Sequence, residues 1–164
     1  MSCPFAQTNP PLHRSGFPDA PFPDPSLYEK LGFDTIANVI RYQHQLLWVS
    51  DSKKHYGDDP VHFAKTVEYT VNYFVEMLGG PNVFTPVRGA PKLGMRHKYF
   101  NLTPNDREIW LDCMRQALKK EAVAPELAQP IWDWIEPLSM RFLRPRVELQ
   151  ELKRVTVNWN QEYD

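Results

Sequence analysis

The sequence predicts an all-α protein, and three observations lead to that prediction. In several stretches the apolar residues recur every three or four positions, as on one face of a helix. No stretch alternates polar and apolar residues as a half-exposed strand would. Proline and glycine divide the chain into segments of ordinary helix length. A chain of 164 residues is long enough for one domain with a substantial core, but too short for two.

The composition is typical of a soluble globular protein, with 24% charged and 13% aromatic residues. A formal net charge of −1 argues against binding to nucleic acid or to a membrane surface. No apolar run has the length of a membrane span, and the N-terminus lacks a signal sequence. Cys3 and Cys113 form no disulfide framework, so we expect a cytoplasmic protein in which Cys113 is a core residue.

Residues 1–25 are predicted to form an extended, proline-rich arm. They contain seven of the sixteen prolines, which prevents a helix, and they lack the alternation of a strand. We expect order in this arm only if Phe5, Phe17 or Phe22 contacts a groove on the rest of the molecule.

The first two helices are predicted between residues 26 and 49. Ser26 is expected to cap a short helix that ends near Gly32, and a second helix is expected to begin at Asp34 or Thr35. A histidine occupies a position on this second helix where the pattern calls for a core residue. The apolar face reads Ile36, Val39, Ile40, His44 and Leu47.

A polar connector ending at Pro60 precedes the third predicted helix, residues 61–78. Polar side chains with hydroxyl groups lie at helical spacing beside its apolar face: Thr66, Thr70 and Tyr73. The apolar face itself consists of Phe63, Val67, Val71, Phe74, Val75 and Leu78.

Residues 78–110 separate this helix from the next one. Gly79-Gly80-Pro81 ends the third helix, because glycine accepts left-handed geometry and proline cannot continue the hydrogen-bond ladder. The next helix begins at Thr103-Pro104-Asn105-Asp106, where the threonine and the aspartate form a capping box. Between these signals, His97 is the one side chain suited to bind a transition metal.

The helix that begins at Pro104 is predicted to reach Lys120, and Pro125 is predicted to begin the last long helix. Pro130 and Pro137 should make this last helix irregular. Residues 144–164 form a charged tail, whose final residues we do not expect to be ordered. Trp132 and Trp134 are expected to pack in the core, while His13 and His62 are expected at the surface.

The stretch from residue 78 to residue 111 resembles the group II truncated haemoglobins. The resemblance is carried by an ordered set of motifs at matching spacing: Gly79-Gly80-Pro81, Arg88-Gly89, Pro91, Leu93, Met95-Arg96-His97 and Arg107-Glu108-Ile109-Trp110-Leu111. Weaker similarity extends from about Leu27 to Phe142. The resemblance implies a two-over-two helical sandwich over residues 26–143, with the proline-rich arm before it and the charged tail after it.

The resemblance also implies a haem cofactor. His97 would be the proximal iron ligand, and the basic residues around it would neutralise the haem propionates. There is no C-x-x-C-H motif, so the haem would be haem b, held without thioether bonds. The residues implied to contact the haem are Phe74, Phe84, Arg88, Lys92, Leu93, Arg96, His97, Thr70 and Trp110, with Lys98 as a further nearby cation.

On the opposite side of the haem, the family pattern implies a ligand pocket. It places His44, Tyr56, Thr66, Thr70 and Trp110 around the bound ligand, with His55 as a neighbour. His44 stands where the family usually has tyrosine, and further departures occur at Leu78, Ala90 and Gly94. A histidine in this position could donate to bound dioxygen, coordinate iron, or carry protons. It could equally be a buried, hydrogen-bonded residue that contacts no ligand.

Three hypotheses of function follow from these observations. The first is a haem protein that binds dioxygen or another small ligand at a pentacoordinate iron, as in oxygen transport. The second is a peroxidase or a nitric-oxide-oxidising enzyme that uses His44 as a proton carrier. The third is a helical interaction module without haem. No reductase domain is evident, so an enzyme would need an external reductase, and the protein could be a monomer or a homodimer.

Overall fold

Helices and connecting loops account for the described part of the chain, which is residues 16–144 and 152–163 of a computed structural model. Within these two ranges there is no β-strand, only an isolated bridge between Leu102 and Leu143. The all-α prediction is therefore confirmed. The helices are α1 (Leu27–Leu31), α2 (Phe33–Trp48), η1 (Asp51–His55), α3 (Pro60–Met77), α4 (Thr85–Arg88), α5 (Leu93–Arg96), α6 (Pro104–Lys120), α7 (Pro125–Ser139), η2 (Met140–Phe142) and α8 (Trp159–Glu162).

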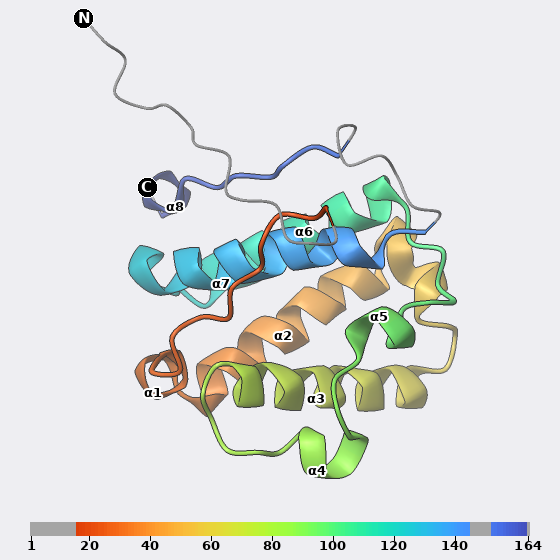
Figure 1. Ribbon diagram of the computed structural model, residues 1–164, viewed down its shortest axis with the longest axis horizontal. Coiled ribbons are helices and arrows are strands. Elements are labelled where there is room, and N and C mark those ends of the chain that lie inside the picture. Colours follow the sequence, from red (N-terminus) through yellow and green to blue (C-terminus); the bar gives the residue numbers. More distant parts are fainter. Residues whose placement is uncertain (1–15, 145–151, 164) are drawn as a thin grey trace, which may run out of the picture.

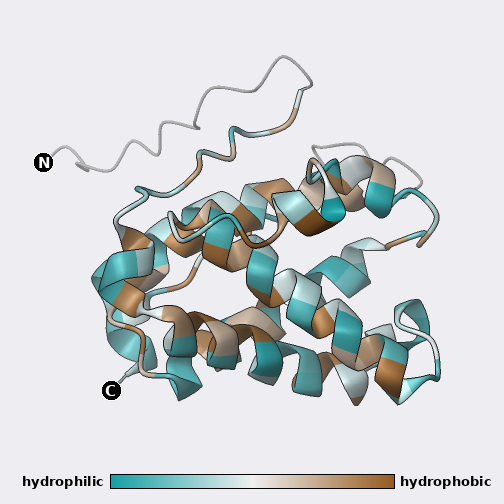
Figure 2. Ribbon diagram, turned by 90° about the horizontal axis from the view of Figure 1, so that it is seen from below, coloured by the Kyte–Doolittle hydropathy of each residue, from teal (hydrophilic) through white to brown (hydrophobic). Residues whose placement is uncertain are grey.

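The four long helices form two antiparallel pairs, one of α2 and α3 and the other of α6 and α7 (Figure 1). The pairs are joined chiefly where α2 packs across α6. Polar and apolar residues alternate around each long helix in Figure 2, as expected for amphipathic helices that bury one face. The predicted two-over-two arrangement is confirmed. Among the described helices, none combines the length and the apolar character that crossing a membrane requires.

The core joins all four long helices and confirms most of the predicted apolar faces. On α2 it includes the buried histidine His44, which has only 3% of its surface exposed. Trp132 and Trp134 are buried as predicted, and so is Cys113. His62 is exposed as predicted, whereas His13 lies outside the described residues.

The predicted starts of two helices are confirmed, and a third differs. At α6 the Thr103 hydroxyl accepts from the Asp106 N–H (3.2 Å), while the Asp106 carboxylate accepts from the Thr103 N–H (3.0 Å). At α3 the Asp59 carboxylate accepts from the Val61 N–H (2.9 Å). Ser26 is the N-cap residue of α1 as predicted, but its side chain makes no capping bond. Instead the Asp24 carboxylate accepts from the Ser26 N–H (2.8 Å).

The end of α3 depends on two glycines, as predicted. Gly79 has φ +100°, and the Gly80 N–H donates to the Val75 carbonyl (2.8 Å). A Cβ atom on Gly79 would collide with the carbonyl of Pro25, and one on Gly80 would lie 2.7 Å from the Tyr28 ring. Both positions therefore require glycine because neighbouring segments approach the backbone closely.

The described part of the N-terminal arm packs against the α7 region. The Phe22 ring lies 5.7 Å from the Trp134 ring, and the Arg141 guanidinium donates to the Pro18 carbonyl (3.0 Å). Phe17 lies beneath the Arg141 guanidinium. Two of the three phenylalanines named from the sequence thus make aromatic contacts, and Phe5 lies outside the described residues.

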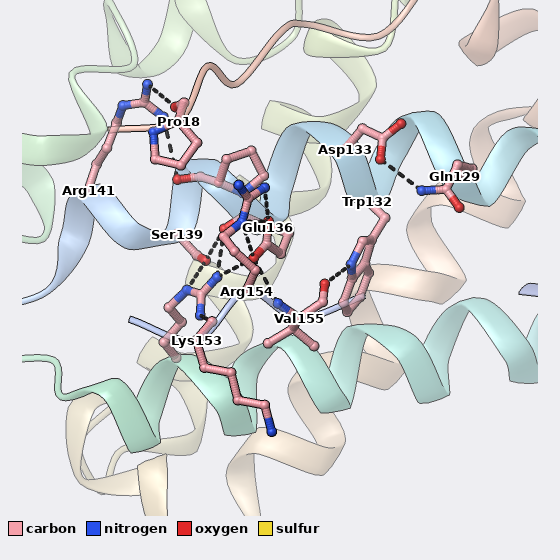
Figure 3. Close-up of polar contacts among 12 residues, drawn as sticks. Pro18, Gln129, Trp132, Asp133, Glu136, Ser139, Arg141, Lys153, Arg154 and Val155 are labelled. Carbon is pink, nitrogen blue, oxygen red and sulfur yellow. Dashed lines mark hydrogen bonds and ion pairs between the residues drawn. The ribbon is translucent and has the colours of Figure 1, made fainter. Parts of the chain in front are cut away.

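The C-terminal tail is held against α6 and α7 by a buried ionic cluster (Figure 3). The Glu136 carboxylate accepts from Arg107 on α6 (2.7 Å) and from Arg154 in the tail (2.7 Å). It also accepts from the Val155 N–H (3.0 Å). Glu136 and Arg107 are almost fully buried. Each neutralises the charge of the other, which would be costly to bury alone.

Beyond this ionic cluster, the tail adds a tryptophan to the core. Trp159 is 3% exposed, and its ring meets the Trp132 ring edge-on at 5.5 Å. The Trp132 indole N–H donates to the Val155 carbonyl (2.8 Å). The expectation that the final residues are not ordered is therefore wrong for residues 152–163, because Trp159 can bury its ring against α7.

Candidate functional site

His97 is the C-cap of α5, and its ring lies against Phe142 of η2. Its Nδ1 is 2.7 Å from the Leu93 carbonyl oxygen. Because a carbonyl only accepts, Nδ1 carries the proton and Nε2 is left with a free lone pair. The Phe142 ring is stacked on the imidazole at 4.5 Å. This arrangement fixes both the tautomer and the ring plane, as a metal-binding histidine requires.

The electrostatic surroundings keep His97 neutral. Burial lowers the pKa of this histidine; the Leu93 carbonyl opposes that effect, and Arg96 adds to it. A neutral imidazole is the form that binds iron. The side chain thus meets the requirement of a proximal ligand, namely a neutral ring whose Nε2 carries no proton.

Arg96 holds the loop before His97 in one conformation. Its guanidinium donates to the carbonyls of Pro91 (2.6 Å) and Arg88 (2.7 Å) and lies over the Phe84 ring. Lys92, just before α5, has a left-handed backbone with φ 40°. This arginine side chain therefore links the end of α4 to the segment that leads into α5.

The other predicted cations of this loop remain at the surface. Arg88, Lys92 and Lys98 are exposed, and within the described residues none of the three forms an ion pair. The Arg88 guanidinium is stacked on the Tyr69 ring of α3 at 4.3 Å. Cations without a carboxylate partner are suited to meet the propionates of a haem.

The apolar residues predicted to contact the haem lie on α3 and in the loop that follows it. Phe74 and Phe84 are buried, and both touch Tyr73 edge-on. Leu93 is half-buried and packs on the same core. The Glu76 carboxylate accepts from the backbone N–H groups at the start of α4 and so ties this loop to α3.

His44 on α2 has the same local geometry as His97. Its Nδ1 is 2.7 Å from the Ile40 carbonyl, so this histidine too is protonated on Nδ1. Burial lowers its pKa to about 4, against a smaller opposing effect of the Ile40 carbonyl. The ring lies edge-on to the Tyr56 ring at 6.0 Å and near the Phe63 ring at 6.1 Å. His44 is therefore neutral at pH 7, and its Nε2 can accept a hydrogen bond but not donate one.

The two threonines predicted in the pocket use their hydroxyl protons within α3. Thr66 donates to the His62 carbonyl (3.2 Å), and Thr70 donates to the Thr66 carbonyl (2.9 Å). A hydroxyl engaged in this way has no proton left for a ligand. In this geometry both threonines can accept a hydrogen bond from a ligand but do not donate one to it.

Trp110 and Tyr56 remain as candidate donors. Within the described residues, neither the Trp110 indole N–H nor the Tyr56 hydroxyl has a hydrogen-bond acceptor. Burial raises the pKa of Tyr56, with further contributions from Cys113 and Asp106, so its hydroxyl keeps its proton. Gln43, fully buried beside His44, fixes the backbone of Trp110 by donating to its carbonyl (3.3 Å).

His55, named from the sequence as a neighbour of the pocket, belongs to a different contact. Its Nε2 is 3.0 Å from the Asp106 carboxylate, which also accepts from the Ser52 hydroxyl (2.9 Å). Burial opposes ionisation of Asp106, but hydrogen bonds from Thr103, Ser52 and His55 lower its pKa to about 2. His55 thus joins η1 to the start of α6 and positions Tyr56, the next residue.

A surface hollow of about 410 Å³ lies between α2 and α6, lined by residues that include Leu46, Ile109 and Cys113. Its lining includes neither His44 nor His97. Sequence reasoning missed three buried polar residues, Gln43, Ser52 and Glu136, and the exposed Arg154 that binds Glu136. Polar residues on otherwise apolar helix faces, at Gln43 and Glu136, were the available signal.

Comparison with known proteins agrees with this geometry. The model of the bacterial-like globin family matches residues 26–143. A group 2 truncated haemoglobin of Bacillus subtilis is 26% identical over 92 residues, which are 56% of this chain and 69% of the relative. A group 2 truncated haemoglobin of Lotus japonicus is 28% identical over 98 residues, 58% of this chain and 57% of the relative.

Solved structures show the same fold. The crystal structure of phosphate-bound Hell's gate globin IV superposes with a TM-score of 0.80 and 30% identity, covering 85% of this chain and 87% of that one. The group II 2-on-2 haemoglobin of Agrobacterium tumefaciens superposes with a TM-score of 0.65 and 26% identity, covering 72% and 93%. The chain belongs to the bacterial-like globin family, as a relative of the group II truncated haemoglobins, and this membership supports the binding of a small ligand at a haem.

Proposed function

We propose that this protein binds haem b, with His97 as the proximal ligand, and holds dioxygen or a similar small ligand at a pentacoordinate iron. The observation that carries the proposal is the bond between His97 Nδ1 and the Leu93 carbonyl, which leaves Nε2 free in a neutral ring. A bound haem would supply the iron atom to which the ligand attaches. Among the chain's own groups, Arg88, Lys92 and Arg96 are suited to neutralise its propionates.

The proposed distal side combines two hydrogen-bond donors with one acceptor. The Trp110 indole and the Tyr56 hydroxyl can donate to a partly negative bound ligand such as dioxygen. His44 accepts only, because its single proton is given to the Ile40 carbonyl. Of the roles considered for His44 from the sequence, donation to dioxygen therefore requires a tautomer other than the one observed.

We expect His44 to leave the iron uncoordinated. Its ring is held by the Ile40 carbonyl and by contacts with Tyr56 and Phe63. Histidine is also shorter than the tyrosine usual at this position in the family, so its ring should fall short of the metal. This supports an open sixth position for an external ligand.

A peroxidase is the second candidate, and one observation favours it. The free lone pair on His44 Nε2 can take a proton from hydrogen peroxide. The low pKa of His44, about 4, makes it a weak base at pH 7, where general bases work best with a pKa near the operating pH. Ligand binding is therefore the better-supported function.

The test uses His97→Ala and, as a matched control, His62→Ala on the exposed face of α3. The His97 variant should lose the Soret absorbance of bound haem and regain it when imidazole is added. The His62 variant should keep normal haem content. Normal haem content and an unchanged spectrum in His97→Ala would show that another residue holds the iron.

A further inference from the structure

The segment around His97 differs in charge from the remainder of the protein. Residues 77–105 contain four basic residues, Arg88, Lys92, Arg96 and Lys98, and no aspartate or glutamate. Outside this range the chain has fifteen lysines and arginines against twenty acidic residues, a net charge of −5. A net charge of +4 within one exposed loop creates a local positive field on an otherwise acidic molecule.

Residues 85–100 are here called the basic segment. The protein itself does not neutralise the four cations of this segment. Within the described residues none of them forms an ion pair with a carboxylate. Elsewhere, exposed or half-exposed arginines do find partners: Arg41 pairs with Glu68 (2.9 Å) and Arg115 with Glu162 (2.8 Å). The basic segment therefore keeps its charge available for an external partner.

The basic segment also exposes apolar side chains. Val87, Met95 and Tyr99 have 69%, 67% and 81% of their surface exposed. Together with Phe100, they make up half of the eight large hydrophobic residues that are exposed among the described residues. Apolar side chains surrounded by charges of one sign are typical of small, transient interfaces between proteins.

Two features connect this surface to the site of the iron. Arg96 binds three backbone carbonyls of the segment, those of Arg88, Ala90 and Pro91, and so makes it one fixed unit. Tyr99 follows His97 by only two residues, and the Lys98 ammonium lies over its ring. In Figure 1, α4 lies beyond α3, at the edge opposite the C-terminal tail. A partner docked here would lie next to the proximal ligand and away from the tail.

Binding of a haem would not cancel this charge. The two propionates carry two negative charges, so the basic segment would retain a net charge of +2. Its partner should therefore be negatively charged. A partner at this surface would lie beside the iron ligand, where it could deliver an electron. This position favours a redox protein over nucleic acid or a membrane.

We propose that the basic segment is the docking surface for a small acidic protein that transfers one electron. The proposal rests on haem binding at His97. In the reaction, one electron passes from the reduced centre of this partner to the ferric iron; the partner is oxidised by one electron and the iron becomes ferrous. No bond is formed or broken in the protein, and the partner then dissociates.

The experiment measures reduction of the haem-loaded ferric protein by reduced flavodoxin, an acidic one-electron flavoprotein, in stopped flow under carbon monoxide. The variants are Lys98→Glu and Val87→Glu/Lys98→Glu, both at exposed positions of the basic segment. The control is Lys30→Glu/Lys120→Glu, which reverses two exposed lysines on α1 and at the end of α6. The uncharged radical of 5-deazariboflavin serves as a second reductant, and it reports any change in the haem site itself.

We expect the double variant to reduce the flavodoxin rate at least tenfold at low ionic strength, with a smaller effect of Lys98→Glu. The difference should shrink as salt is added, because screening removes the steering field. The rate with 5-deazariboflavin should be the same in all haem-loaded variants. The Lys30→Glu/Lys120→Glu control should match the wild type with both reductants.

A second readout does not depend on haem chemistry. Oxidised, isotope-labelled flavodoxin is titrated with the full chain, and its NMR shifts report binding directly. Equal shifts and equal reduction rates for the wild type and the double variant would overturn the docking proposal. So would a double variant that loses binding only to anionic lipid vesicles or to an oligonucleotide. A wild-type protein without a Soret band would instead contradict haem binding, which separates the two failures.

Discussion

His44 and His97 are the two histidines whose tautomers the structure fixes most clearly. Each donates Nδ1–H to the carbonyl four residues earlier, and burial lowers the pKa of each. Their difference lies in their surroundings: His44 is on a long core helix among Tyr56 and Phe63, while His97 ends a short helix in a loop. The same local chemistry can therefore produce an iron ligand in one place and a distal acceptor in the other.

Replacing His44 by leucine should make the protein less sensitive to acid. In the folded protein the pKa of His44 is about 4, below its ordinary value of 6.5. Between these values the unfolded chain takes up a proton that the folded chain does not, so the free energy of unfolding falls as pH falls. From pH 7 to pH 5 the loss from His44 alone is about 2 kcal/mol.

Denaturant unfolding of the wild type and His44→Leu at pH 7 and pH 5 checks this expectation. The wild type should lose about 2 kcal/mol more than the variant over this range, and His62→Leu should behave as the wild type. Equal losses in the wild type and His44→Leu would show that His44 is not buried in neutral form. For the same reason, any pH dependence that His44 gives to ligand binding should lie below the ordinary titration range of histidine.

Replacing Trp110 by phenylalanine should speed the escape of a bound ligand. The indole N–H has no acceptor among the described residues, and phenylalanine keeps much of the bulk while it removes that donor. Loss of a hydrogen bond of about 1.5 kcal/mol corresponds to a roughly tenfold faster dissociation. Flash photolysis or stopped-flow measurement of dioxygen dissociation gives the rate. An unchanged rate would assign Trp110 a packing role alone.

At the scale of single residues, the sequence predicted the family better than the hydrogen bonds of the candidate site. The order of motifs from Gly79 to Trp110 predicted the family, and with it His97 as the candidate iron ligand. The sequence did not predict that the hydroxyls of Thr66 and Thr70 each find a carbonyl one helical turn away. Competition of this kind depends on side-chain rotamers, which the order of residues does not determine.

Among the elements, the tail differs most from the prediction. Residues 144–164 carry many charges, which suggested a solvated segment. Arg154 and Trp159 instead dock on α7, because Glu136 on that helix supplies a buried carboxylate and Trp132 a ring surface. A local sequence signal could not show this, since the partners are 18 and 27 positions apart.

The ionic cluster should be essential for holding the tail. In Glu136→Gln the two arginines lose their shared carboxylate, and Arg107 becomes an uncompensated buried charge. We expect the free energy of unfolding to fall by about 3–5 kcal/mol. Glu126→Gln, at an exposed position of the same helix, should change it by no more than about 0.5 kcal/mol. The two variants are compared by urea denaturation; equal stability would mean that the cluster contributes little.

Boundaries of elements were predicted well where a cap defines them. Thr103 and Asp106 form the capping box that places the start of α6 at Pro104, and α6 ends at Lys120 as predicted. The start of α2 was placed one or two residues late, because Gly32 serves as its N-cap without any side-chain bond. Side-chain caps leave a recognisable residue pattern, while a glycine cap leaves only a break.

For the whole molecule, one core cluster includes residues from α1, α2, α3, α6, α7 and the tail. Such continuity predicts a single cooperative unfolding transition. Far-UV circular dichroism and tryptophan fluorescence should therefore give the same midpoint in urea, since Trp134 and Trp159 belong to this one cluster. A fluorescence transition at lower urea would indicate that the tail separates first.

The overall architecture was predictable because the helical spacing of apolar residues, the helix caps and the family motifs indicated the same helices over residues 26–143. Four amphipathic segments of suitable length, joined by short connectors, have few ways to bury their apolar faces together. The charge asymmetry of the molecule can also be read from the sequence, but the sequence does not show which side chains accompany the charges at the surface. Only the exposure of Val87, Met95 and Tyr99 shows that the basic segment presents an apolar surface as well.

Because Pro25 lies against Gly79, the evolution of the proline-rich arm depends on the residue at position 79 of the globin domain. A side chain at position 79 would collide with the Pro25 carbonyl, so the arm tolerates only glycine there. A chimera that joined this arm to a relative with a larger residue at the corresponding position would contain a steric clash. The arm and the glycine are therefore epistatic: the arm requires a glycine at position 79, whereas the glycine does not require the arm.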